Sequence, residues 1–143
     1  GIANVPTGTS GDVVVTFTGV FLRCGIGVYS ATNLASATAT DSAGSSAAAP
    51  TYDIDVVAGG FALGCSYSAD TATATWTALT ENYDEAVEGA GSAHSGAIAE
   101  FATTQTNTTL TCTWTSSSTP AGAFASWEAA AATKKNLLLL GVG

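Results

Sequence analysis

Hydrophobic and polar residues alternate along much of this chain, a pattern typical of strands with one buried and one exposed face. In DVVVTFTGVFLRC, at residues 12–24, the alternation puts Val13, Val15 and Phe17 on one face. In TYDIDVVA, at residues 51–58, aspartates alternate with larger apolar residues. Both segments are therefore predicted to be strands, the second with its aspartates in solvent.

Two later segments nearly repeat each other, as TATWT at 73–77 and TCTWT at 111–115. Each tryptophan is in register with small or apolar residues, whereas the threonines fall on the opposite face. Threonine suits a pleated, half-exposed surface. We therefore interpret Trp76 and Trp114 as inward-facing residues of two strands, and not as a catalytic element written twice.

A further strand is predicted in GFALGCSYS, at residues 60–68, with its larger side chains together on the inward face. Across all these strands, the side chains expected to be largely buried between two sheets are Phe17, Ile54, Phe61, Leu63, Trp76, Phe101 and Trp114.

Turn-rich stretches separate the alternating segments, and they are rich in Gly, Ser, Pro and Asp. They lie at 6–12, 41–50, 58–60, 88–96 and 116–122. About eight short strands with such spacing predict an all-β fold, an antiparallel β-sandwich or jelly roll. We expect the sandwich to cover residues 1–127 and a C-terminal extension or arm to cover 128–143. The stretch SWEAAAATKKN fits either a brief helix or a last strand through Trp127 followed by a tail.

The chain has few charged residues, and its acidic residues outnumber its basic ones. Only 10% of the residues are charged, against roughly 25% in typical domains, and the net charge is −8. Three cations cannot form the basic patch that a phosphate backbone requires, so we expect no nucleic-acid partner. No run approaches the ~18–20 apolar residues of a membrane helix, so no membrane partner is expected.

The residues that usually carry chemistry are few. The three cysteines Cys24, Cys65 and Cys112 contain no CxxC pair, and His94 is the single histidine. A zinc site needs closely spaced ligands, and a serine nucleophile needs a supporting motif that His94-Ser95 lacks. We expect no enzymatic activity, no cofactor and no bound metal. The cysteines are interpreted as small buried strand residues, with an intermolecular disulfide as the alternative.

Two other groups of side chains leave a binding role open. The acidic run ENYDEAVE is interpreted as a solvated loop, with weak calcium binding as the alternative; its carboxylates are Glu81, Asp84, Glu85 and Glu88. Three tyrosines could stack on sugar rings, although core or interface packing is the simpler interpretation; they are Tyr29, Tyr67 and Tyr83. A glycosylation sequon begins at Asn107 and matters only in a secreted protein.

Three segments resemble a group of small β-rich proteins encoded among phage and prophage structural genes. They are GIGVYSATNLASATATDSA, TATWTALTENYDEAVE and HSGAIAEFATTQTNTTLTCTWT. The resemblance covers about residues 24–127 and consists of segment order and turn residues. It departs at Ala78, where the group's pattern has glycine. The resemblance implies a β-rich virion component, without implying which one.

Two functions follow as hypotheses. The first is a non-enzymatic virion structural protein, a capsid decoration (cement) protein or else a tail or spike component, assembled in the host cytoplasm. Its partners would be the major capsid protein or another virion protein, and further copies of itself. The alternative is a carbohydrate-binding or adhesion module of a host-recognition fibre or secreted protein.

The C-terminal sequence KKNLLLLGVG suggests a docking segment. An exposed run of four leucines would be an aggregation hazard. We therefore expect a partner subunit to bury Leu137, Leu138, Leu139 and Leu140, with the run added to a sheet edge. The alternative is a strand of the domain's own core.

Overall fold

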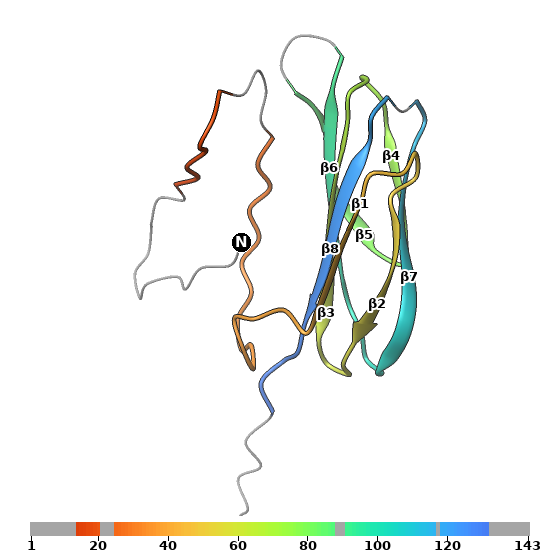
Figure 1. The fold of residues 1–143 in the computed structure, drawn as a ribbon. Helices are drawn as coiled ribbons and strands as arrows, with labels where there is room; N and C mark the ends of the chain where they lie inside the picture. Colours follow the sequence, from red (N-terminus) through yellow and green to blue (C-terminus); the bar gives the residue numbers. More distant parts are fainter. Residues whose placement is uncertain (1–13, 21–24, 88–90, 117, 132–143) are drawn as a thin grey trace, which may run out of the picture.

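The computed structural model shows an all-β fold (Figure 1) and describes residues 14–20, 25–87, 91–116 and 118–131. Eight strands follow one another along the chain: β1 Asp41–Ser45, β2 Thr51–Val56, β3 Phe61–Ser68, β4 Ala74–Thr77, β5 Thr80–Ala86, β6 Ala93–Glu100, β7 Gln105–Trp114 and β8 Ala121–Trp127. The described residues contain no helix, and therefore none that could cross a membrane.

The strands form two antiparallel sheets that face each other (Figure 1). One sheet has five strands in the order β1-β8-β3-β6-β5, and the other has three in the order β2-β7-β4. All strand pairs are antiparallel. The predicted β-sandwich is confirmed, whereas the more specific jelly-roll topology stays a prediction.

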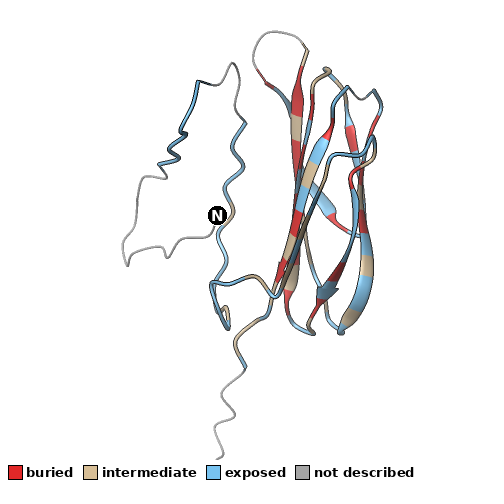
Figure 2. Ribbon diagram, in the orientation of Figure 1, coloured by how far each residue is buried: buried red, intermediate tan, exposed pale blue. Residues whose placement is uncertain are grey.

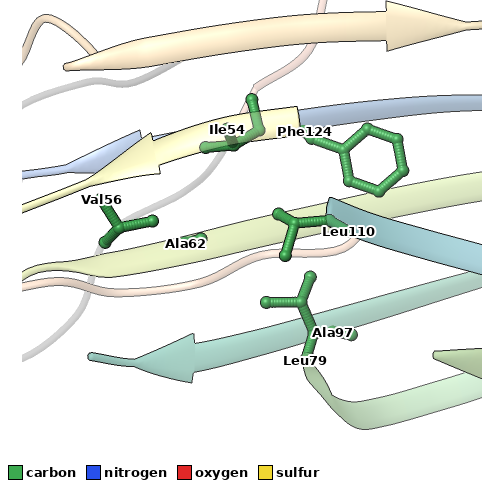
Figure 3. Packing of buried hydrophobic residues seen from close by; sticks show 7 residues of the cluster. All are labelled: Ile54, Val56, Ala62, Leu79, Ala97, Leu110 and Phe124. Atoms are coloured by element: carbon green, nitrogen blue, oxygen red, sulfur yellow. The ribbon is translucent and has the colours of Figure 1, made fainter. Parts of the chain in front are cut away.

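The core lies between the sheets, and buried positions alternate with more exposed ones most clearly along β3 and β8 (Figure 2). Its main cluster joins residues of both sheets around Phe124 (Figure 3). The fully or almost fully buried members are Ile54, Val56, Ala62, Leu79, Ala97, Leu110 and Phe124. Ile54 and Leu110 come from the three-stranded sheet, and Ala62, Ala97 and Phe124 from the five-stranded sheet.

Both repeated tryptophan segments are strands, β4 and β7, as predicted. Trp114 is buried with Leu110 and Cys112, and Trp76 is partly buried against both core clusters. The threonines of these strands, such as Thr75 and Thr113, point to solvent on the other face. The sequence pattern therefore identified the inward face of this sheet correctly.

The inward face of β3 was predicted wrongly. Its buried residues are Ala62, Gly64, Ser66 and Ser68, while Phe61 and Leu63 are half-buried on the outer face. The small side chains leave room for the two tryptophans of the opposite sheet. A β-carbon on Gly64 would overlap the ring of Trp76. Large residues on one sheet are thus matched by small residues on the other, as close packing requires.

Several local predictions also differ from the structure. Residues 14–20 form no strand, and Phe17 is 44% exposed instead of buried, because this segment is not one of the eight strands that enclose the core. The stretch 41–50, predicted as a turn, contains the edge strand β1, which pairs with β8 and packs Ala43 against the core. The acidic stretch ENYDEAVE, predicted as a loop, contains the edge strand β5, which pairs with β6. The stretch 88–96, predicted as a turn, contains the start of β6 at Ala93, which pairs with β3 and β5. Phe101, predicted to be largely buried, is half-buried.

An aspartate closes each lateral seam of the sandwich. Asp41 of β1 accepts a hydrogen bond from the backbone N–H of Asp55 on β2, at 2.9 Å. Asp84 of β5 accepts one from the backbone N–H of Ala74 on β4, at 2.8 Å. Free N–H groups on an edge strand invite pairing with another chain. These carboxylates satisfy such donors and join the two sheets at both sides.

The last strand ends at Trp127, so the strand interpretation of SWEAAAATKKN is confirmed up to this residue. Beyond it, Ala129 forms an isolated antiparallel bridge with Leu34, upstream of β1. Residues 132–143 lie outside the described part of the chain. The proposed boundary between domain and arm therefore stays a prediction.

Candidate functional site

A hollow of about 310 Å³ lies on the outer face of the five-stranded sheet. The extended segment 25–29 forms one side, and the outward side chains of β5 and β6 form the other. In Figure 1 the chain before β1 runs alongside the sandwich. The lining residues are Ile26, Gly27, Val28, Tyr29, Asn82, Tyr83, Glu85 and His94.

Three rings dominate this hollow. The ring centroids of Tyr29 and Tyr83 are 6.4 Å apart, and those of Tyr83 and His94 are 5.2 Å apart. Both ring pairs are tilted, at 35° and 52°. Tyr67 on β3 lies directly opposite His94 in the strand register. The order β3-β6-β5 thus brings Tyr67 and Tyr83 to one end of the same face, where the segment 25–29 places Tyr29 over Gly96 of β6.

Glycines allow this close approach of rings and backbone. A β-carbon on Gly96 would lie 2.5 Å from both Tyr29 Oη and the Tyr83 ring. A β-carbon on Gly25, in the overlying segment, would lie 2.6 Å from the His94 ring. Such distances are too short for any real side chain. Gly96 on β6 and Gly25 above it therefore fix the spacing between the segment 25–29 and the sheet.

The hollow contains polar atoms that no described residue satisfies. Tyr29 Oη and His94 Nδ1 are both buried without a hydrogen-bond partner among the described residues. The pKa of Tyr29 is raised to about 12, mainly because the hydroxyl is buried and secondly because the Tyr83 hydroxyl lies nearby. Burial also raises the pKa of Tyr83. Such groups are costly to leave unpaired, and because both atoms are buried, a ligand hydroxyl would reach them only after the covering segment 25–29 moved.

These features suit a small polar ligand with an apolar face. Aromatic rings can stack against such a face while their polar atoms bind its hydroxyl groups. The volume falls at the lower end of the range for small-molecule sites, about 300–1,000 Å³. The sequence singled out the tyrosines, but it gave no signal for His94 or Gly96. Their contribution depends on strand pairing that joins distant residues.

The acidic residues do not gather into one site in the described part of the chain. The strand register is irregular at Asn82. Beyond it, Asp84 and Glu85 face opposite sides of β5. Asp84 is engaged with Ala74, as described above. Burial, followed by the charge of Asp84, raises the pKa of Glu81. Among the described residues, no three Asp, Glu, His or Cys side chains are grouped as metal ligands require. Glu88 lies outside them.

The two described cysteines occupy different environments. Cys112 is a free thiol in the core, as the sequence predicted, and burial raises its pKa to about 11. Cys65 is a free thiol on the exposed outer face, so its predicted burial is wrong. It is exposed because its strand neighbours, Ala123 and Gly96, are small. Cys24 lies outside the described residues.

The remaining sequence candidates are separated by the fold. Ser95 points inward and binds Trp76, so it lies on the face opposite His94 and forms no pair with it. Asn107 is exposed at the start of β7, with a φ of 53°. The docking candidates Leu137, Leu138, Leu139 and Leu140 lie outside the described residues, so their role stays a prediction.

The chain was also compared with known proteins. No protein-family model matches it, and neither a curated protein nor a solved structure is detectably similar to it.

Proposed function

We propose that this protein is a non-enzymatic structural component of a phage particle, as a decoration (cement) protein on the capsid surface. Its proposed partners are the major capsid protein and further copies of itself, and its proposed location is the virion. The sequence resemblance to proteins encoded among phage structural genes supports this proposal.

One structural observation carries the proposal furthest. Two neighbouring inner strands of the five-stranded sheet, β8 and β3, have no charged side chain on their outer face. Charged residues are depleted at the centres of protein interfaces. On a chain with a net charge of −8, such a face supports a function that depends on association with other proteins.

The test is to measure whether the protein is part of the particle. Virions of the phage whose gene cluster encodes this chain would be purified on a density gradient and analysed by quantitative mass spectrometry. A decoration protein is expected at a fixed stoichiometry to the major capsid protein. Purified protein should also bind particles from a deletion strain. A protein found only in the host-cell fraction would contradict the proposal.

A C-terminal deletion tests the docking segment separately. Removing residues 134–143 should leave the melting temperature unchanged while it prevents attachment to the particle or assembly of copies. Loss of the fold would show instead that Leu137–Leu140 belong to the domain's own core.

The hollow around Tyr29 supports a second candidate, the carbohydrate-binding module. Its tilted rings suit the apolar face of a sugar ring. A glycan array would test this function with the wild type and with Tyr83→Ala. Tyr52→Ala is the matched control, because Tyr52 is 43% exposed and lies on the three-stranded sheet. Binding that is lost only in Tyr83→Ala would favour this candidate.

A further inference from the structure

Two tyrosine rings of the hollow lie slightly too close together for a ligand to enter between them. The ring centroids of Tyr29 and Tyr83 are 6.4 Å apart. A ligand ring stacked between them would need about 7–8 Å, because each stacking contact takes about 3.5–4.0 Å. A displacement on the order of 1 Å would therefore make the gap wide enough.

One of the two rings belongs to a segment that is mostly exposed. We call residues 25–29 the strap. Residues 25–28 are exposed and Tyr29 is partly buried, whereas Tyr83 lies on β5, which is paired with β6. Segments that bury little apolar surface open locally at a low free-energy cost. Opening should therefore move Tyr29 away from the sheet and leave Tyr83 in place.

The strap lies on the sheet with its smallest residues. A β-carbon on Gly25 or Gly27 would overlap a ring of the sheet, so these two glycines are on the sheet side. Ile26 and Val28 alternate with them and are 52% and 64% exposed. Among the side chains of the strap, the ring of Tyr29 therefore contributes most of the contact with the sheet.

The polar atoms between the strap and the sheet indicate what kind of ligand enters. Tyr29 Oη and His94 Nδ1 are buried there without a hydrogen-bond partner among the described residues. Buried polar atoms normally have a partner, and hydroxyl groups of a ligand would supply one when the strap lifts. Asn82 and Glu85 also line the hollow and can bind further hydroxyl groups. Glu85 and the net charge of −8 disfavour an anionic ligand.

We infer that the hollow is the closed form of a binding site for one neutral sugar ring, which enters between Tyr29 and Tyr83 when the strap lifts. The apolar face of the sugar stacks on Tyr83, and its hydroxyl groups satisfy the buried polar atoms. The volume of about 310 Å³ suits a single ring. The inference rests on the second candidate function, carbohydrate binding, and adds how the site opens.

A disulfide that locks the strap to the sheet tests the inference. A β-carbon on Gly25 would lie 2.6 Å from Cγ of His94, so the β-carbons of the two residues are within about 4 Å, as a disulfide requires. The lock is Gly25→Cys with His94→Cys in the full-length chain. The background carries Cys24→Ser and Cys65→Ser to prevent mispairing. Melting temperatures of the oxidised and the reduced lock would confirm that both are folded.

Binding of neutral sugars would be measured by saturation-transfer NMR and titration calorimetry, with the methyl glycosides of glucose, galactose, mannose and N-acetylglucosamine as probes. We expect the oxidised lock to bind about tenfold or more weakly than the reduced lock, because a closed strap removes the binding-competent state. The matched control is His94→Cys alone in the same background, which should bind equally with and without oxidant. Equal binding by the oxidised and the reduced lock would overturn the inference and leave the carbohydrate candidate standing.

A second measurement detects the opening without a sugar, and it also serves if the lock has lost affinity together with His94. Acetylation of Tyr29 by N-acetylimidazole would be quantified by peptide mass spectrometry. Tyr29 should be labelled in the wild type and in the reduced lock, and about tenfold or more slowly in the oxidised lock. Tyr52, exposed on the other sheet, is the internal control and should be labelled equally in all of them.

The outcomes of this labelling are distinct. Equal labelling of Tyr29 in the oxidised and the reduced lock would overturn the inference. If the lock controls the labelling but no methyl glycoside binds the wild type, the inferred ligand and the carbohydrate candidate are both wrong.

Discussion

The indole Nε1 of Trp114 donates a 2.9 Å hydrogen bond across the sandwich to Oγ of Ser66. The other repeated tryptophan does the same, since Trp76 Nε1 donates to Ser95 Oγ at 2.8 Å. Each serine in turn donates to a backbone carbonyl, that of Ala121 or that of Tyr83. The two near-identical sequence segments therefore build two equivalent polar links between the sheets.

Removing either serine hydroxyl should destabilise the protein, because it leaves an indole N–H without its partner. We expect Ser66→Ala to lower the free energy of unfolding by about 1–3 kcal/mol. Ser95→Ala should cost less, since Trp76 is less buried than Trp114. Urea denaturation would measure both. Ser42→Ala, on the exposed face of β1, is the control and should change the midpoint little. An unchanged midpoint for Ser66→Ala would contradict this role of the link.

A second prediction concerns the space that the tryptophans occupy. A β-carbon at Gly64 would overlap the Trp76 ring and lie 3.0 Å from Leu79 Cδ1. Gly64→Ala should therefore cost about 1–3 kcal/mol, as overpacking of a core does. Gly44→Ala, in the same sheet, is the matched control, because its nearest atom would be at an ordinary 3.5 Å. Similar midpoints in both variants would show that the two sheets can separate without cost.

The sequence predicted the three-stranded sheet well. Thr75 and Thr113 identify its solvent-exposed face, and Trp76 and Trp114 identify the face that packs against the other sheet. It failed on β3 because both of its faces contain apolar or small residues. Periodicity reveals which residues share a face, but not which face meets the other sheet. The large rings opposite Gly64 decide that question, and only the pairing of the sheets reveals them.

The candidate site was predictable only in part. The sequence singled out Tyr29, Tyr67 and Tyr83 as possible stacking residues, but nothing local shows that they meet. Their proximity depends on the strand order β3-β6-β5 and on Gly96, which lets the rings approach the backbone. The segment 12–24 failed in the opposite way. Its pattern predicts a strand, but its described residues, 14–20, belong to none of the eight strands.

The turn between β4 and β5 contains a conformation that its residue does not favour. Ala78 has a φ of 65°, in the left-handed region, at the position where the resembling proteins have glycine. A left-handed L-residue costs about 1–2 kcal/mol, of which the greater flexibility of unfolded glycine offsets a part. We expect Ala78→Gly to stabilise the protein by up to about 1 kcal/mol. Ala102→Gly, at an exposed position without positive φ, should destabilise it slightly. Equal effects of both substitutions would contradict the strain at Ala78.

Glu81 makes stability depend on pH. Burial and the charge of Asp84 raise its pKa in the folded protein above the ordinary 4.5. Its contribution to stability is therefore fully present below pH 4.5 and is lost as the pH rises through the folded pKa. Glu81→Gln should increase the melting temperature at pH 7 and have little effect at pH 4. Glu85→Gln, at an exposed position on the same strand, provides the control, and an identical pH profile for both variants would argue against this account.

The aromatic hollow should make the protein sensitive to alkali through Tyr29. Its pKa rises from 10.0 to about 12 in the folded state, chiefly because its ring is buried against the sheet. Unfolding lets this hydroxyl ionise near pH 10, so its contribution to stability is complete below pH 10 and disappears as the pH rises towards about 12.

Tyr29→Phe should remove this part of the alkaline loss. Near pH 7 the substitution should be neutral or slightly stabilising, because the buried Oη has no hydrogen-bond partner among the described residues. Melting temperatures between pH 8 and about pH 12, the range that this shift spans, would be measured together with phenolate absorbance. The absorbance of the wild type should show late ionisation of Tyr29 and of Tyr83, whose pKa burial also raises, and the Tyr29 part should be missing in Tyr29→Phe. Tyr52→Phe, an exposed tyrosine on the other sheet, is the control. If Tyr29→Phe and Tyr52→Phe lose stability in alkali to the same extent, Tyr29 does not hold the segment 25–29 on the sheet in the way that the hollow implies.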